Sequence, residues 1–139
     1  MVTVALDSYM FIGLIQGESA AIKKMFSDLG RGRLSAVASS LVLAEVKYRI
    51  GRELGEDRAV EACVFVRAIS NLSLVDVTPE IAEAAASLRL RYYSPKSQLS
   101  FADCIHAATA LSKNCDFLAT GDEDFSAIKE LKTELVKER

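Results

Sequence analysis

The chain has 139 residues, 50% of them hydrophobic, and 17 Lys and Arg side chains against 19 Asp and Glu give it a net charge of −2. This length and apolar content predict a single domain over residues 1–139 with a full core. The slightly acidic balance excludes the uniformly basic surface of a protein that coats nucleic acid. The three cysteines form no CxxC pair, and no segment approaches the roughly 20 apolar residues that span a bilayer. We therefore expect a cytoplasmic protein without a membrane anchor.

Short apolar runs alternate with longer helical patterns along the chain. The predicted strands cover residues 2–6, 34–38, 72–77 and 116–119, with a weak last strand at 133–137. The predicted helices cover residues 8–15, 19–29, 40–54, 57–69, 79–92, 101–113 and 125–131. Continuous apolar strands suit a sheet that is covered on both faces, and two helices often stand between successive strands. This order predicts an α/β fold, a three-layer α/β/α sandwich with a mainly parallel sheet.

Acidic residues follow two of the predicted strands. Asp7 ends the first strand, and Asp122 comes just after "DFLAT", next but one to Thr120. Functional sites of open α/β sheets lie at the carboxyl ends of the strands. Asp7 is explained equally well as the N-cap of the next helix. After "DFLAT", we assign Asp122 to the site and Asp124 to the cap of the next helix.

Two more carboxylates lie within predicted helices. Glu45 stands among apolar neighbours in "SSLVLAEVKYRI", where it either pairs with Arg49 or needs another partner or a metal. Asp103 in "SFADCIHAATAL" fits a capping box with Ser100, and it could also serve a site. His106 shares its side of this helix, either as a packed residue or as a hydrogen-bond donor to the site.

The joint pattern of the acids favours a metal site. Like charges that lie close together raise carboxyl pKa values and weaken the fold unless a cation joins them. Carboxylate oxygens without His or Cys partners select Mg²⁺ or Mn²⁺ over zinc. An ion held by few carboxylates and several waters is typical of phosphoryl chemistry.

Four segments, in this order, resemble the PIN-domain family over nearly the whole chain. They are "VALDSYMFI", "SSLVLAEVKYRI", "SFADCIHAATAL" and "FLATGDEDF". The resemblance is closest to the small toxin ribonucleases of VapC type. It implies a PIN-like fold and a metal-dependent endoribonuclease that hydrolyses RNA as the toxin of a type II toxin–antitoxin pair. It also implies a homodimer and a small antitoxin that blocks the site.

The resemblance also implies roles for individual residues. Asp7, Asp103 and Asp122 would hold Mg²⁺ or Mn²⁺. Glu45 would orient the attacking water or hold a second ion, which makes it the fourth catalytic acid. The supporting hydroxyls would be those of Ser8 and Thr120. The resemblance assigns no RNA-binding residue, and each basic group that could serve is also explained as a solvated helix face. These groups are Lys23 with Lys24, Arg31 with Arg33, Lys47 with Arg49 and Arg52, and residues 89–96.

Several other functions fit parts of the same pattern. A PIN-like domain could bind RNA or a protein without cutting, although all four acids are present, or it could process RNA rather than act as a toxin. A phosphatase of the haloacid dehalogenase type needs a second acid two residues after the first, where this chain has Tyr9. A response-regulator receiver needs its phosphorylated Asp on a central strand, for which we find no good match.

Overall fold

The computed structural model describes residues 1–17 and 19–136, and within them it contains one five-stranded sheet. The strands are β1 (Thr3–Leu6), β2 (Ser35–Ser39), β3 (Leu72–Val75), β4 (Phe117–Thr120) and β5 (Thr133–Leu135). They pair in parallel in the order β3-β2-β1-β4-β5. The predicted mainly parallel sheet is thus confirmed, its weak last strand included. Residue 137, the predicted end of that strand, lies outside the described residues.

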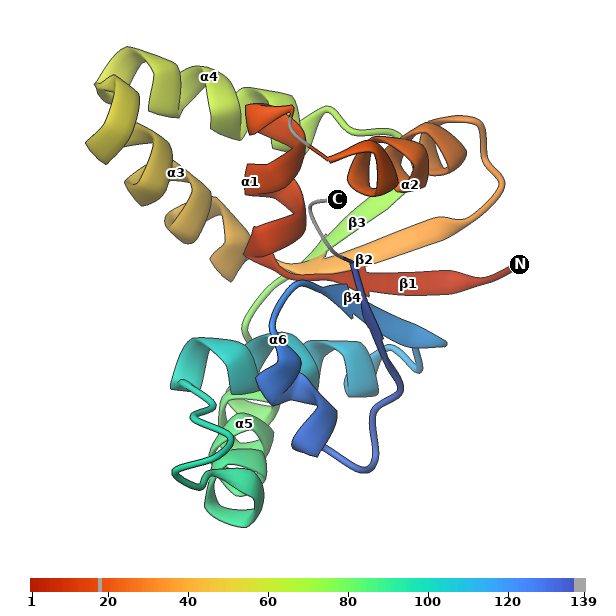
Figure 1. Ribbon diagram of the computed structural model, residues 1–139, viewed down its shortest axis with the longest axis vertical. Coiled ribbons are helices and arrows are strands. Elements are labelled where there is room, and N and C mark those ends of the chain that lie inside the picture. Colours follow the sequence, from red (N-terminus) through yellow and green to blue (C-terminus); the bar gives the residue numbers. More distant parts are fainter. Residues whose placement is uncertain (18, 137–139) are drawn as a thin grey trace.

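Helices cover both faces of this sheet (Figure 1). The helices of one face are α1 (Ser8–Gln16), α2 (Ala20–Gly30), α3 (Leu41–Leu54) and α4 (Glu56–Arg67). The other face carries α5 (Pro79–Tyr92), α6 (Phe101–Ser112) and the 3₁₀ helix η1 (Glu123–Ala127). This arrangement confirms the three-layer sandwich. None of the described helices has the length and hydropathy that a bilayer-spanning segment needs.

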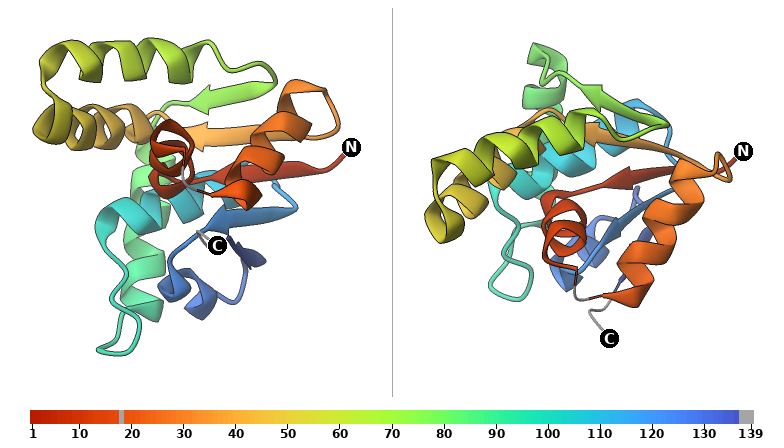
Figure 2. Two further views of the ribbon diagram at one scale, coloured as in Figure 1. Left: turned by 45° about the horizontal axis from the view of Figure 1, so that its top comes forward. Right: turned by 90° about the horizontal axis from the view of Figure 1, so that it is seen from above.

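The helices α3 and α4 run antiparallel and lie side by side (Figure 2). Gly55 joins them with φ 95°, a backbone conformation that favours glycine. Helix α3 matters for the site because it starts at the carboxyl edge of the sheet. Its first residue, Leu41, comes two residues after the end of β2.

The strands are mainly apolar because they separate two cores. Successive side chains of a strand point to opposite faces. Val4 and Leu6 of β1 enter the core under α1–α4, whereas Ala5 enters the core under α5 and α6. In the second core, α6 buries small side chains, and this helix contacts α5 as well as β1, β2 and β4. These small residues are Ala107, Ala108 and Ala110.

The helix predicted over residues 125–131 is wrong. The structure has the 3₁₀ helix η1, which begins earlier, at Glu123. The buried residues of this stretch are Phe125, Ile128 and Leu131, which recur every third position. Only Phe125 lies in η1, whereas Ile128 and Leu131 follow it in the turn that leads to β5. The apolar positions are therefore buried as predicted, but most of them belong to a turn rather than to a helix.

Candidate active site

A cavity of about 340 Å³ opens beside the first turns of α1 and α6, at the carboxyl edge of the sheet. It is lined by Asp7, Ser8, Tyr9, Ile12, Gly13, Gln16, Arg49, Asp103 and Asp122. Three of the four predicted acids therefore meet here, together with the predicted Ser8. They come from the two ends of the chain, and the parallel sheet brings them together because its strands all end at the same edge.

Asp7 occupies the N-cap position of α1, but its side chain makes no capping hydrogen bond. The residue is only 5% exposed, and its Oδ2 accepts a hydrogen bond from the hydroxyl of Thr120. Its Oδ1 is buried without a hydrogen-bond partner in the described residues. Burial raises the pKa of Asp7 to about 6, and the charge of Asp103 adds to this, while Thr120 and His106 oppose it. Asp7 is thus a buried carboxyl group with one oxygen left unsatisfied.

Thr120 connects Asp7 to the loop that carries Asp122. The Thr120 hydroxyl is fully buried, and besides donating to Asp7 it accepts a hydrogen bond from the Asp122 N–H at 3.1 Å. Oδ1 of Asp122 accepts from the Asp124 N–H at 2.9 Å and so caps η1. Our assignment of the cap to Asp124 is therefore wrong, because Asp122 both caps η1 and lines the cavity.

Asp124 is a carboxyl group that sequence reasoning missed as a neighbour of the site. Burial raises its pKa, and the charges of Asp122 and Asp103 raise it further, so Asp124 lies within electrostatic reach of both acids. In the sequence, the signal for this is the run of acids in "GDEDF", where a capping pattern alone predicts a role for Asp124 outside the site.

Asp103 takes part in the predicted capping box. Its Oδ2 accepts from the Ser100 N–H at 2.9 Å, and its own N–H donates to the Ser100 hydroxyl at 3.0 Å. The second carboxylate oxygen, Oδ1, has no part in the box. Because Asp103 also lines the cavity, capping and a role in the site are compatible in one side chain.

Glu45 does not line the cavity, and of the two predicted alternatives it has another partner rather than Arg49. Arg49 pairs with Glu53, which contradicts a Glu45–Arg49 pair. Oε1 of Glu45 instead lies 2.6 Å from Nε2 of His106, a residue that is 3% exposed. The spacing of His106 from Asp103 had suggested a donor to the site, but no local pattern pointed to a contact between residues 61 positions apart.

The loop after β4 packs tightly against Tyr9, and this packing yields a first prediction. A Cβ atom at Gly121 would lie 2.2 Å from the Tyr9 ring. We expect Gly121→Ala to lower the free energy of unfolding by about 1–3 kcal/mol because the ring and the Asp122 loop must move apart. Gly30→Ala is the control, since nothing lies within 4 Å of its new Cβ atom. Urea denaturation compares the two, and equal stability of both variants would contradict the tight packing.

The carboxylates of the cavity fit a hard divalent cation bound partly through water. Among residues 1–17 and 19–136, no three His, Cys, Asp or Glu side chains are already placed to hold a metal ion together. Mg²⁺, however, is usually bound by one or two carboxylates and keeps several of its waters. Asp7, with its unsatisfied Oδ1, fits this mode together with Asp103 or Asp122 in the same cavity.

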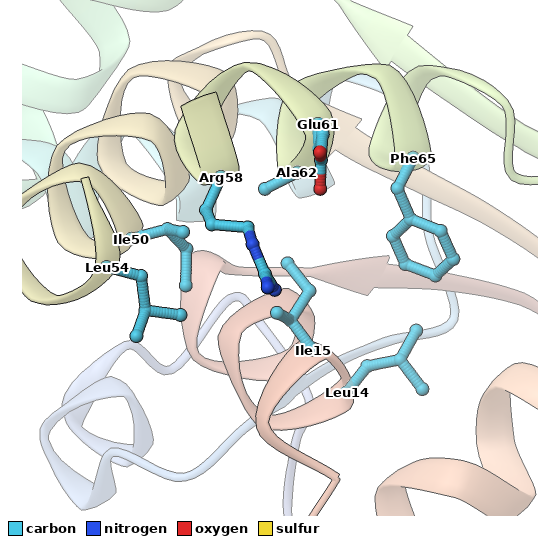
Figure 3. A pocket seen from close by; sticks show the side chains of 8 residues that line it. All are labelled: Leu14, Ile15, Ile50, Leu54, Arg58, Glu61, Ala62 and Phe65. Carbon is cyan, nitrogen blue, oxygen red and sulfur yellow. The ribbon is translucent and has the colours of Figure 1, made fainter. Parts of the chain in front are cut away.

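A second hollow of about 320 Å³ lies between α1, α3 and α4 (Figure 3). Its walls are mainly apolar. It is lined by Leu14, Ile15, Ile50, Leu54, Arg58, Glu61, Ala62 and Phe65. Since it brings together only one basic and one acidic side chain, this groove suits an apolar segment of a partner rather than a reaction.

Comparison with known proteins identifies the family. Residues 4–131 match the model of the PIN domain. No curated protein sequence matches the chain. Among solved structures, VapBC2 of Rickettsia felis, bound to a DNA fragment from its promoter, is similar with a TM-score of 0.79 and 18% identity over 98% of this chain and 100% of that chain.

Two further structures have the same fold. VapC20 of Mycobacterium tuberculosis, described as a toxin that cleaves the Sarcin-Ricin loop, has a TM-score of 0.74 and 22% identity over 91% of this chain and 95% of its own. VapBC-1 of nontypeable Haemophilus influenzae has a TM-score of 0.74 and 18% identity over 96% and 98%. At these identities the likeness concerns the fold. With the family model matched over most of its length, this chain belongs to the PIN-domain family and shares the fold of VapC toxins.

Proposed function

We propose that this PIN domain is a metal-dependent endoribonuclease that hydrolyses RNA phosphodiester bonds and acts as the toxin of a type II toxin–antitoxin pair in the cytoplasm. One observation carries the proposal: Asp7 is buried, has an unsatisfied oxygen, and shares a cavity with Asp103 and Asp122. Such a cluster weakens the metal-free fold, because burial and like charges both disfavour ionised carboxylates. A bound cation would remove this cost in folding free energy. The cluster of acids is therefore better explained by metal binding than by a contribution to stability.

The proposed roles of the cavity acids follow from their places in it, and the role of Glu45 follows from the family resemblance. Asp7, Asp103 and Asp122 would hold Mg²⁺ or Mn²⁺, which when bound supplies an acidified water and offsets charge on the phosphoryl oxygens. Thr120 restricts rotation of the Asp7 carboxylate through its hydrogen bond. Glu45 would orient the attacking water.

Two more residues of the cavity suit an RNA substrate. Arg49 is the one basic side chain among those that line the cavity; its Nε donates to Glu53, and the other N–H groups of its guanidinium can pair with an RNA phosphate beside the acids. Ser8 also lines the cavity, and its hydroxyl would support the acids or the substrate. An anionic substrate therefore has an attractive group beside a cluster that would otherwise repel it.

Incubation of the purified chain with ribosomal RNA tests the activity. We expect cleavage with Mn²⁺ or Mg²⁺, none with EDTA, and none by Asp103→Asn with either ion. RNA binding without cleavage under all conditions would support the inactive PIN-like module instead. Expression in a bacterial host separates the remaining roles, because a toxin stops growth whereas an RNA-processing nuclease does not.

The solved relatives of VapBC type support a protein partner for this chain as well. We propose an antitoxin that docks an apolar segment in the groove of Figure 3. At the rim of this groove, Leu54 is 60% and Phe65 46% exposed. The groove shares α1 and α3 with the acid cavity, so a segment bound there would lie beside the acids and could block them. We also propose that the chain forms a homodimer, as the family resemblance implies.

A further inference from the structure

We propose that His106 is a positioning residue that holds the carboxylate of Glu45 at the catalytic edge of the sheet. As a role in catalysis, this rests on the proposed nuclease function. The two residues lie on α6 and α3, which cover opposite faces of the sheet (Figure 1). A contact between them has to pass the carboxyl edge, where β2 ends at Ser39 and α3 begins two residues later.

The burial of the two partners shows which one holds the other. The side chain of His106 is 2% exposed and fixed by its packing, whereas that of Glu45 is 32% exposed. A free Glu side chain samples many rotamers, and fixing it costs conformational entropy. The hydrogen bond of 2.6 Å from a packed ring selects one of those rotamers before substrate arrives. His106 thus supplies the fixed point, and Glu45 is the group that is oriented.

The other ring nitrogen defines the direction of this hydrogen bond. Nδ1 of His106 is buried and has no hydrogen-bond partner in the described part of the chain. The proton of a neutral ring therefore belongs on Nε2, where Glu45 accepts it, rather than on Nδ1. His106 lies about one turn of α6 after Asp103, which lines the acid cavity. The ring therefore holds Glu45 at the same end of the sheet as the acids.

A kinetic cycle separates positioning from packing. We expect His106→Leu to lower kcat by about 10–100-fold with little change in KM, the usual effect of losing a residue that orients a ligand or catalytic group. His106→Gln should keep most of the activity, because its amide nitrogen can donate from about the position of Nε2. In a Glu45→Ala background, the residual rate should change by less than about twofold on His106→Leu, since the group it positions is gone.

Thr109→Val is the matched control for this cycle. Thr109 is buried on α6 like His106, but its hydroxyl donates to the Ile105 carbonyl and does not contact Glu45. Thr109→Val should lower the free energy of unfolding about as much as His106→Leu does, but it should leave kcat unchanged. The proposal is overturned if His106→Leu lowers kcat by the same factor with and without Glu45, or if His106→Gln is no better than His106→Leu.

A spectroscopic measurement tests the contact without metal or RNA. His106 is the single histidine of the chain, so ¹⁵N-histidine labelling gives the signals of one ring once any tag is removed. We expect an exchange-protected Nε2 proton that loses its protection in Glu45→Ala. An unprotected Nε2 proton in the parent would reject the contact. If the Nε2 proton is protected but the protein cleaves no RNA, the nuclease function is rejected while the hydrogen bond between His106 and Glu45 stands.

Discussion

Replacing Asp7 with Asn should stabilise the metal-free protein relative to the parent increasingly as the pH rises from about 4 to about 7. The pKa of Asp7 is raised from 3.8 to about 6 by burial, so the folded parent keeps a proton that the unfolded chain releases. The stability of the parent therefore falls as the pH passes between these two values. Since each pKa unit corresponds to about 1.4 kcal/mol, the difference between variant and parent should change by roughly 3 kcal/mol.

Urea denaturation with EDTA at a series of pH values measures this change. The pH dependence is decisive, because any fixed cost of burying the Asn amide adds the same amount at each pH. Asp76→Asn serves as the control, since Asp76 also follows a strand but is exposed, and its difference from the parent should stay nearly constant. A constant difference for Asp7→Asn as well would show that its burial does not disfavour the charged form.

Ser100→Ala and Asp103→Asn should have opposite effects on stability and metal response. Ser100→Ala removes the cap hydroxyl and should cost about 0.5–2 kcal/mol, but it leaves the acid in place. Asp103→Asn can still accept the hydrogen bond from the Ser100 N–H, so the box survives while the charge is lost. The parent and Ser100→Ala should gain about 2.7 kcal/mol from Mn²⁺ at 100 times its Kd, and Asp103→Asn should gain none.

Thermal melting with and without Mn²⁺, followed by the RNA cleavage assay, completes this comparison. We expect Ser100→Ala to melt earlier and still cleave, and Asp103→Asn to melt no earlier than the metal-free parent and not cleave. An Mn²⁺ response in Asp103→Asn equal to that of the parent would reduce Asp103 to a helix cap.

The sequence was sufficient for the fold because its signals are local. The apolar run before Asp7 ends where β1 ends, and Thr78 caps α5, with Pro79 as its first residue. The carboxyl-end rule then placed Asp7 and Asp122 at one edge of the sheet before any contact was known. The failure at residues 125–131 has a local cause too, since apolar residues three positions apart do not distinguish an α-helix from a short 3₁₀ helix followed by a turn.

The contacts of the site could not be predicted, because they join residues far apart in the chain. The hydrogen bond from Thr120 to Asp7 spans 113 positions, and the one between His106 and Glu45 spans 61. Helical spacing puts His106 on the same side as Asp103, but it does not say which group of another layer the ring meets. Sequence position identified the acids, and tertiary packing selected their partners.

The strand order β3-β2-β1-β4-β5 also explains why the cavity lies where it does. From β1 the chain moves to β2 and then β3 on one side, and only afterwards crosses to β4 on the other. The connections that leave β1 and β4 therefore diverge and leave a crevice between them, the topological switch point where α/β proteins bind ligands. Asp7 and Asp122 follow the two strands that flank it. The connectivity of the backbone creates the cavity, and the carboxylates that line it determine which ligands it can bind.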